Sequence, residues 1–296
     1  MDWQEQLIAL YLFVCKHYRS SLHVYCQRFT NYANLTFSDE EVITLYLFGV
    51  IQRRKQVKEI YSYAANHLSE WFLNLPNTYG AFVQRLNRVS GAFSPMIELI
   101  LQAHPRELTG TTDPLLIDSM PIILAHRSRR FKANVAPEIA TNNGYCATKK
   151  LHYYGVKLHV LARQGKGKLP MAEYFGLTDA DMHDNKAFEQ IAPVLQGEEI
   201  YADKAYSDSF APENKSFKLF TPVKKKKGEA FLEVADQWLS TAVSQVRQPI
   251  ESLFNWFEDK TGIQIASKVR SYKGLMVHVF GKIAAALCIK CSIISP

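Results

Sequence analysis

The chain has 296 residues, of which 47% are hydrophobic and 21% are charged. This composition permits a large buried core and excludes a chain that is disordered throughout. The formal net charge of +7 suits a polyanionic partner without identifying one. Five cysteines are few for this length and odd in number, so no disulfide framework is expected. The first residues, MDWQEQ, are acidic, with neither the basic n-region nor the cleavage site of a signal peptide, and we therefore expect a cytoplasmic protein.

Helical periodicity dominates the first hundred or so residues. Ser38 followed by Glu41 has the pattern of a capping box, and apolar residues recur at helical spacing from Val42 onward. Further helical runs are predicted over residues 57–68 and 79–89. The N-terminal third is therefore expected to be a helical region.

Short β-type runs follow the helical region. They cover residues 115–117, 154–161, 171–177, 200–202 and 217–220, with a helical run over 185–195 between the third and the fourth. From about residue 229 the pattern is helical again. This order of elements predicts an α/β fold with a mixed sheet flanked by helices.

Two of the predicted strands deliver an aspartate at their ends. Asp118 follows the apolar run LLI, and Asp203 follows IYA. Pro121 is expected to stop regular strand pairing just after the first of them. Because ligands bind at strand ends in open sheets, we expect Asp118 and Asp203 side by side on neighbouring strands. An aspartate at a strand end is also common turn chemistry, which is the alternative interpretation for each residue alone.

A third carboxylate, Glu251, lies in the segment VRQPIESLFNWF. Pro249 suits the first turn of a helix and places Glu251 near the helix N-terminus. Arg247 and Glu251 are four residues apart, so a surface ion pair is an alternative interpretation. Three converging carboxylates would repel one another, and a hard cation such as Mg²⁺ or Mn²⁺ removes that repulsion. Two such ions, about 3.5–4 Å apart, are the usual arrangement for in-line displacement at phosphorus.

Five segments follow one another from about Leu115 to the C-terminus: LLIDSMPI, HYYGVKLHVLAR, GLTDADMHDN, IYADKAY and VRQPIESLFNWFEDKTG. Taken in order, they resemble the motifs of bacterial DDE-type insertion-sequence transposases, which have a ribonuclease H-like catalytic core. Related families read Tyr-x2-Arg-x3-Glu-x6-Lys in the last segment. This chain matches the arginine and the glutamate but has Ser244 and Glu258 at the tyrosine and lysine positions, with Lys260 the nearest lysine.

The resemblance implies a helical DNA-binding region over residues 1–110 and a ribonuclease H-like catalytic domain over residues 111–296. It implies that Asp118, Asp203 and Glu251 are catalytic and bind two Mg²⁺ ions, with Mn²⁺ as a substitute. The implied partner is double-stranded DNA, both the element's terminal inverted repeats and the target DNA. Cleavage at the element's ends exposes a 3′-OH, which then attacks the target. A homodimer on DNA is expected, with no membrane and with nucleoid association when DNA is bound.

Basic residues are expected to supply most of the DNA affinity through phosphates. The segment HRSRRFK is the stronger candidate because it follows Asp118 closely, whereas the lysines at 224–227 equally suit a solvated loop. The predicted helix over 79–89 carries side chains that can read base edges or form a solvated face. The residues expected to contact DNA are Arg85, Arg88, Arg127, Arg129, Arg130, Lys157, Lys204, Arg247 and Lys260.

Other functions remain open from the sequence. A structure-specific nuclease would use the same carboxylates without strand transfer, and a captured transposase would hold DNA without cutting it. A two-carboxylate glycosidase is disfavoured by the basic surroundings of the acids. His183 is expected either to assist at the site or to be structural.

Two further features are expected to be structural. The CIKC spacing of Cys288 and Cys291 lacks the second pair of ligands that a zinc site needs, which favours packed thiols. The apolar tract over 274–289 contains His278 and Lys282, which favours a buried helix over a membrane span.

Overall fold

The structure is a computed structural model that describes residues 2–27, 35–104, 113–147, 149–165, 167–195, 197–207, 216–225 and 231–294. The chain divides into two compact units, one made of Met1–Arg106 with Phe257–Pro296 and the other of Glu107–Trp256. The expected boundary between residues 110 and 111 lies outside the described residues. The division also differs from the expectation in one respect, because the C-terminal segment from Phe257 groups with the N-terminal helices.

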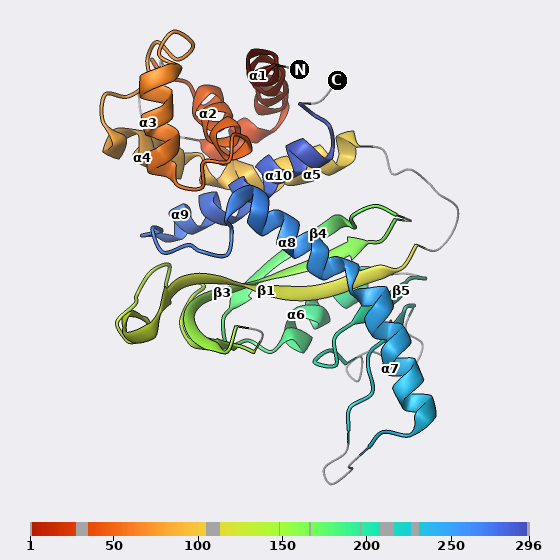
Figure 1. Ribbon diagram of the computed structural model, residues 1–296. Helices are drawn as coiled ribbons and strands as arrows, with labels where there is room; N and C mark the ends of the chain where they lie inside the picture. Colours follow the sequence, from red (N-terminus) through yellow and green to blue (C-terminus); the bar gives the residue numbers. More distant parts are fainter. Residues whose placement is uncertain are drawn as a thin grey trace. The chain divides into compact units, whose positions relative to one another are not determined.

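The first unit is helical, as the sequence predicts (Figure 1). In the described residues it comprises α1 (Trp3–Ser20), η1 (Leu22–Cys26), α2 (Asp39–Ile51), α3 (Val57–His67), α4 (Tyr79–Arg88), η2 (Ser90–Ala92), α5 (Phe93–Ala103), α9 (Tyr272–Met276), the π-helical turn η5 (Val277–Gly281) and α10 (Lys282–Lys290). The capping box that begins α2 is confirmed, since the Ser38 hydroxyl accepts from the Glu41 N–H and Glu41 accepts from the Ser38 N–H. Helix α2 is the centre of this unit and packs against α1, α3, α4 and α10.

Specific contacts explain why the C-terminal segment joins the helical unit. The Tyr46 hydroxyl of α2 donates to the Val277 carbonyl at 3.0 Å. Gly281 lies against the same ring, and a Cβ there would come within 2.5 Å of a ring carbon. The run Tyr272–Lys290 is long and apolar enough to span a membrane, yet 61% of it is buried inside the protein. It is therefore the buried core helix that the sequence predicts.

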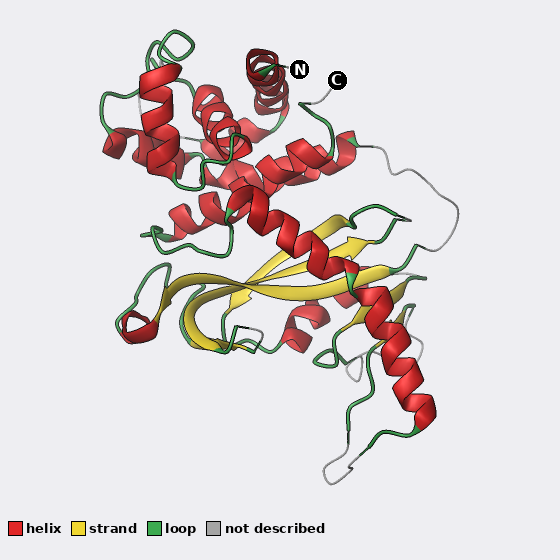
Figure 2. Ribbon diagram, in the orientation of Figure 1, coloured by secondary structure: helices red, strands yellow, loops and turns green. Residues whose placement is uncertain are grey.

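The second unit contains a curled mixed sheet (Figure 2). Its described strands are β1 (Leu115–His126), β2 (Asn143–Cys146), β3 (Leu151–Arg163), β4 (Met171–Asp179), β5 (Glu199–Ala202) and β6 (Lys218–Phe220). Its helices are η3 (Arg127–Phe131), α6 (Asp184–Ile191), η4 (Ala192–Val194), α7 (Val234–Arg247) and the first part of α8 (Pro249–Thr261). All five predicted strand segments and the predicted helix after the third of them are present, while β2 was not predicted.

The strand order is β2-β3-β1-β5-β6, with β4 also paired to β3. Strand β1 is antiparallel to β3 and parallel to β5, and β5 is parallel to β6. Helix α6 covers one face of the sheet (Figure 1), where Phe188 and Ile191 join Ile117 and Ile200 in one buried cluster. This arrangement confirms the predicted mixed sheet flanked by helices.

The expected end of β1 at Pro121 is wrong. The strand continues to His126 and stays paired with β3, with Pro121 opposite Lys157. The described pairing with β5 reaches only to Ile117, so Pro121 lies on an edge of β1 where a missing N–H costs no ladder hydrogen bond. As a result, Asp118 lies where the pairing with β5 stops, rather than at the end of the strand.

Candidate active site

The two aspartates lie at neighbouring positions on adjacent parallel strands. The last registered pair of β1 and β5 is Ile117 with Ala202, and Asp118 and Asp203 are the next residue of each chain segment. Ile117 and Ala202 both belong to the cluster beneath α6. Because side chains alternate between the faces of a sheet, Asp118 is directed toward the opposite face, and the Asp203 carboxylate is near enough to raise its pKa. The expected neighbouring placement of Asp118 and Asp203 is therefore what the structure shows.

Arg247 links Asp118 to Glu251. Its guanidinium donates to Asp118 Oδ2 at 2.7 Å and to Glu251 Oε1 at 3.0 Å. The Arg247 side chain is 16% exposed and the Asp118 side chain 20%, whereas Glu251 is 56% exposed. Helix α7 ends at Arg247 and α8 begins at Pro249, which places Glu251 in the first turn as predicted. The i,i+4 pair is thus part of a bridge to the sheet rather than an isolated surface ion pair.

Burial dominates the electrostatics of Asp118. It raises the pKa of this carboxyl from 3.8 to about 6, although the Arg247 guanidinium and the Ser119 N–H lower it. The carboxylates of Asp203 and Asp184 raise the pKa further. Asp118 therefore lies in an environment whose burial disfavours the ionised form, and a cation near it would stabilise that form.

Asp184 is a functional candidate that the sequence reasoning missed. Its Oδ1 accepts from Lys157 Nζ at 3.1 Å and from the Ser119 hydroxyl at 3.2 Å. Lys157 also donates to the Met182 carbonyl at 2.7 Å, so this expected DNA contact is engaged inside the protein. The signal for Asp184 in the sequence is its place in GLTDADMHDN, directly after His183. His183 is the N-cap of α6, and its Nδ1 accepts from the Asn185 N–H at 3.4 Å.

The turn after β5 is built around Asp203. Its Oδ1 accepts from the Lys204 N–H at 2.7 Å, and its carbonyl accepts from the Tyr206 N–H at 3.0 Å. Asp203 is therefore a turn former as well as the neighbour of Asp118.

The Tyr206 side chain is 2% exposed, and its hydroxyl has no hydrogen-bond partner in the described part of the chain. Burial, together with the carboxylates of Asp184, Asp118 and Asp203, holds the pKa of Tyr206 well above its ordinary value.

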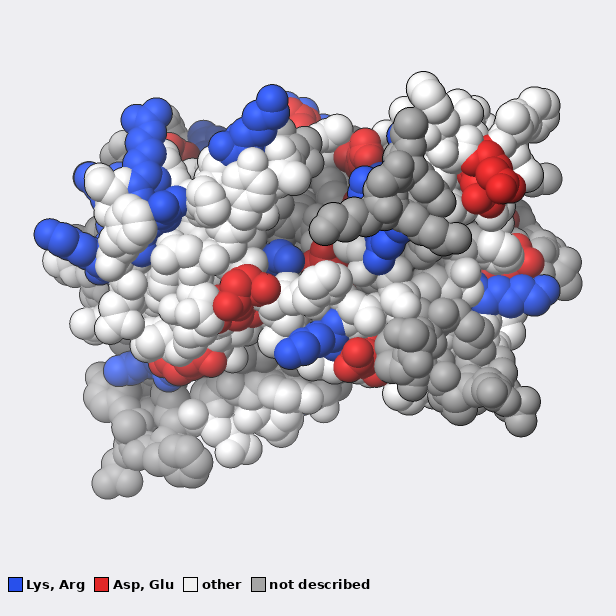
Figure 3. Space-filling view, turned by 90° about the horizontal axis from the view of Figure 1, so that it is seen from below, with Lys and Arg blue, Asp and Glu red and all other residues white. Residues whose placement is uncertain are grey.

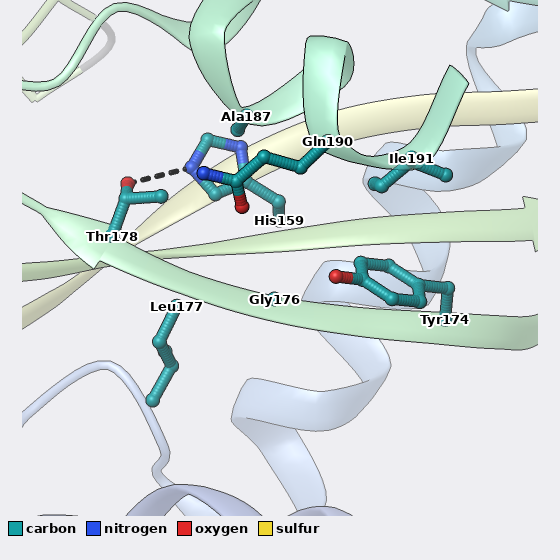
Figure 4. Close-up of a pocket in the computed structure, with 8 residues that line it drawn as sticks. All are labelled: His159, Tyr174, Gly176, Leu177, Thr178, Ala187, Gln190 and Ile191. Carbon is teal, nitrogen blue, oxygen red and sulfur yellow. Dashed lines mark hydrogen bonds between the residues drawn. The ribbon is translucent and has the colours of Figure 1, made fainter. Parts of the chain in front are cut away.

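A small cavity of about 70 Å³ lies between the sheet and α6 (Figure 4). It is lined by His159, Tyr174, Gly176, Leu177, Thr178, Ala187, Gln190 and Ile191. His159 Nε2 is 2.8 Å from the Thr178 hydroxyl, and burial lowers the pKa of the imidazole to about 4. The histidine is therefore neutral at physiological pH. The residues that line the cavity include none of the three predicted acids.

The arginine segment after β1 is farther from Asp118 than expected. The rest of β1 separates them, a distance of roughly 25 Å along an extended strand. The cause is the continuation of β1 past Pro121. Arg127 and Arg129 are exposed, and the Arg130 guanidinium lies 4.3 Å from the centre of the Phe131 ring. Lys204 is exposed next to Asp203.

The residues of the helical unit that are expected to contact DNA lie in different environments. Arg85 is half-buried and donates to the Phe37 carbonyl, whereas Arg88 is exposed on α4. Lys260 pairs with Asp259 at 3.5 Å. Glu258, at the family's lysine position, accepts from the Gln264 N–H at 2.8 Å.

Figure 3 shows basic and acidic side chains interspersed on one face of the protein rather than gathered in separate blocks.

The geometry and chemistry of the acids bear on whether they can hold a metal ion. Among the described residues, no three His, Cys, Asp or Glu side chains converge tightly enough to hold an ion. Asp118 and Asp203 nevertheless present oxygen donors from neighbouring chain segments. The guanidinium of Arg247 is hydrogen-bonded to both Asp118 and Glu251. A donor set made only of carboxylate oxygens fits a hard divalent cation.

The curled mixed sheet flanked by helices is consistent with a ribonuclease H-like DDE domain. Residues 109–271, more than half of the chain, match the family model described as "Transposase DDE domain". The chain therefore belongs to this family of transposases, whose members use divalent metal ions. No curated protein and no solved structure is significantly similar to the chain.

Proposed function

We propose that the protein cuts DNA at the ends of an insertion sequence and joins the exposed ends to target DNA. Asp118, Asp203 and Glu251 are the catalytic acids in this proposal, and they hold two Mg²⁺ ions. The observation that carries the proposal is the placement of Asp118 and Asp203 at adjacent positions of two parallel strands, with Arg247 tying Asp118 to Glu251. When bound there, the two ions supply activation of the attacking oxygen and stabilisation of the leaving oxygen.

The chain's own residues orient the acids and the DNA. Arg247 fixes the carboxylates of Asp118 and Glu251, and its fork of donors suits a phosphate oxygen as well. Lys204 is exposed beside Asp203 and supplies a positive charge for a neighbouring phosphate. Arg247 and Lys204 thus supply hydrogen-bond donors and positive charge for a phosphodiester that approaches the acids.

We assign recognition of the terminal repeats to the helical region within residues 1–110 and catalysis to a domain that begins at about residue 111. Arg88 is exposed on α4 and is the better base-reading candidate, because Arg85 is engaged with a backbone carbonyl. Two element ends must be held together during transposition, so a homodimer on DNA in the cytoplasm is part of the proposal.

The test is cleavage of a labelled duplex that carries the element's own terminal repeat, in Mg²⁺. Asp203→Asn keeps the size of the side chain and its ability to accept from the Lys204 N–H, but removes the charge. We expect the wild type to nick at the end of the repeat, and the variant to bind the duplex without cutting it. Asp236→Asn, a charge removal in the first turn of α7, is the matched control and should cut normally.

The alternative functions give different results in the same assay. Equal cutting by the wild type and Asp203→Asn contradicts the catalytic role of this acid. Tight binding of the repeat without cutting by either protein indicates a captured DNA-binding protein. Cutting that does not depend on the repeat, and that is not followed by joining to a second duplex, indicates a nuclease.

A further inference from the structure

The first turn of α6 is connected to both chain segments that carry the paired aspartates. Asp184 and Asn185 are the first two residues of this helix, and neither belongs to the proposed catalytic acids. Each makes a hydrogen bond to a residue close in sequence to one of the aspartates. These two contacts connect one helix turn to strand β1 and to the segment that follows β5.

On the β1 side, the contact is made by Asp184. The Ser119 hydroxyl, on the residue directly after Asp118, donates to Asp184 Oδ1 at 3.2 Å. The Ser119 backbone N–H donates at 2.8 Å to Asp118 Oδ1. A single residue of β1 is therefore bonded both to the Asp118 carboxylate and to α6. Displacement of the strand relative to α6 would break the hydrogen bond from Ser119 to Asp184, while the Ser119–Asp118 bond lies within the strand.

On the β5 side, the contact is made by Asn185. Its Oδ1 accepts from the Ser207 N–H at 2.7 Å. The Tyr206 N–H, one residue earlier, donates to the Asp203 carbonyl at 3.0 Å. Asn185 therefore anchors the far end of the short turn that begins at Asp203.

The charge on Asp184 is balanced within the same cluster. Lys157 Nζ lies 3.1 Å from its Oδ1, and both side chains are 19% exposed. Strand β3, which carries Lys157, pairs with β1 along its length. The ion pair fixes the Asp184 carboxylate against the sheet, so that it is a stationary acceptor for Ser119.

We propose that the first turn of α6 is a positioning element for the acid pair, in which Asp184 fixes β1 at Asp118 and Asn185 fixes the turn that carries Asp203. This inference rests on the proposed function, because it takes Asp118 and Asp203 as the residues that bind divalent cations. Residues that orient metal ligands typically change metal affinity by about 10–100-fold when they are replaced.

The experiment measures Mn²⁺ binding to the full-length protein without DNA, by titration of the free ion's electron paramagnetic resonance signal. Asp184→Ala and Asn185→Ala are each expected to weaken Mn²⁺ binding by about 10–100-fold. Asp184→Asn retains an oxygen acceptor for Ser119 and should lie between Asp184→Ala and the wild type. Asp181→Ala, an exposed aspartate just before α6, is the matched control and should bind Mn²⁺ as the wild type does.

A purely structural role gives a different pattern. If Asp184→Ala and Asn185→Ala lower the melting temperature but bind Mn²⁺ as the wild type does, the inference is overturned. If Asp184→Ala does not fold, Asp184→Asn and Asn185→Ala decide the question. Absence of Mn²⁺ binding by the wild type overturns both this inference and the proposed metal site.

Cleavage of the labelled duplex separates the two proposals. Weakened Mn²⁺ binding by the α6 variants, together with a wild type that does not cut, leaves the positioning role standing and removes the proposed function. If the wild type cuts and the α6 variants bind Mn²⁺ and cut normally, the proposed function stands and the positioning role is removed.

Discussion

Arg247 is bonded to two carboxylates at once, and this makes its removal costly. Asp118 is largely buried, and Arg247 is the first of the two groups that lower its pKa. Removing one partner of a buried pair leaves an uncompensated charge, at a cost of about 3–5 kcal/mol. The side chains retain some exposure, so the lower end of this range applies.

Arg247→Met is therefore expected to lower the free energy of unfolding by about 3 kcal/mol at pH 7. The double variant Asp118→Asn/Arg247→Met should recover most of this loss, because the buried charge is then absent. Chemical denaturation of the two variants and the wild type measures the difference. An Arg247→Met protein as stable as the wild type would show that the Asp118–Arg247 bridge does not contribute in solution.

Tyr206 carries a buried hydroxyl that lacks a partner among the described residues. Leaving such a group unsatisfied costs about 1–3 kcal/mol. Its ring packs edge-on against the Phe188 ring, with the two ring centres 6.0 Å apart, and a phenylalanine at position 206 would keep that contact. Tyr206→Phe should thus raise the free energy of unfolding by about 1 kcal/mol.

Tyr46→Phe is the matched control for this change. It removes a hydroxyl that does have a partner, the Val277 carbonyl, and should lower the free energy of unfolding by about 1 kcal/mol. Thermal unfolding of both variants is the measurement. Destabilisation by Tyr206→Phe would mean that the hydroxyl is hydrogen-bonded in the folded protein.

Lys282 gives the helical unit a predictable pH dependence. It is 3% exposed and donates to the Gly262 carbonyl at 3.1 Å, and burial lowers its pKa from 10.5 to about 7. Between these two values the unfolded chain holds a proton that the folded protein has lost. Its contribution to stability therefore rises with pH from about 7 to 10.5.

Lys282→Met should reduce this rise, because the variant has no amine to titrate. Melting temperatures at pH 6.5 and pH 9.5 measure it, and the difference between wild type and variant isolates Lys282 from the other titrating groups. If both proteins show the same pH dependence, the folded lysine does not have a lowered pKa.

At the scale of elements, the pairing of β1 with β3 depends on a close approach of the two backbones. Gly155 lies opposite Ile123, next to an irregularity in the register of the two strands. A Cβ on Gly155 would overlap the Ile122 carbonyl oxygen and lie 3.1 Å from the Leu124 nitrogen. Both are backbone atoms, so relief requires the strands to separate.

Gly155→Ala should for this reason lower the free energy of unfolding by about 2 kcal/mol. Gly165→Ala, where a Cβ meets nothing within 4 Å, is the control and should change it little. Chemical denaturation compares the two. Equal stability of both variants would show that β1 and β3 accommodate a methyl group at this position.

The sequence predicted the local features of the fold and missed those set by distant contacts. The capping box at Ser38 and the helix start at Pro249 depend on a few adjacent residues and were correct. The extent of β1 past Pro121 depends on which edge has a partner, and Asp184 depends on a lysine and a serine from two strands. Local patterns do not contain that information.

The same limit explains the candidate site. Asp118 and Asp203 were predicted as neighbours because each follows a recognisable apolar run, and the register of β1 with β5 places them so. The bridge from Arg247 to Asp118 was not predicted, because the spacing of Arg247 and Glu251 already suggested a simpler ion pair. The catalytic roles of these acids stay predictions.

For the whole molecule, the net charge of +7 indicates that DNA affinity depends on salt. Acidic side chains interrupt the basic ones on the face in Figure 3, so local groups of basic residues matter more than the total. The segment η3 is one such group, with Arg127 and Arg129 both exposed. It lies roughly 25 Å along β1 from Asp118, so a DNA contact made by these arginines would be separate from the proposed catalytic acids.

Replacing both Arg127 and Arg129 by alanine should weaken duplex binding and make the plot of log K against log[salt] shallower by about 1.8, since each lost phosphate contact contributes about 0.9. Cleavage at saturating DNA should be unchanged, because the acids and Arg247 are untouched. Ser128→Ala, in the same segment, is the uncharged control and should leave the slope as it is. Fluorescence anisotropy measures the slopes between about 50 and 200 mM salt, a range over which phosphate contacts change the affinity for DNA strongly. An unchanged slope in the double variant would place the DNA path away from η3, and a lost cleavage rate at saturation would bring this segment into the active site.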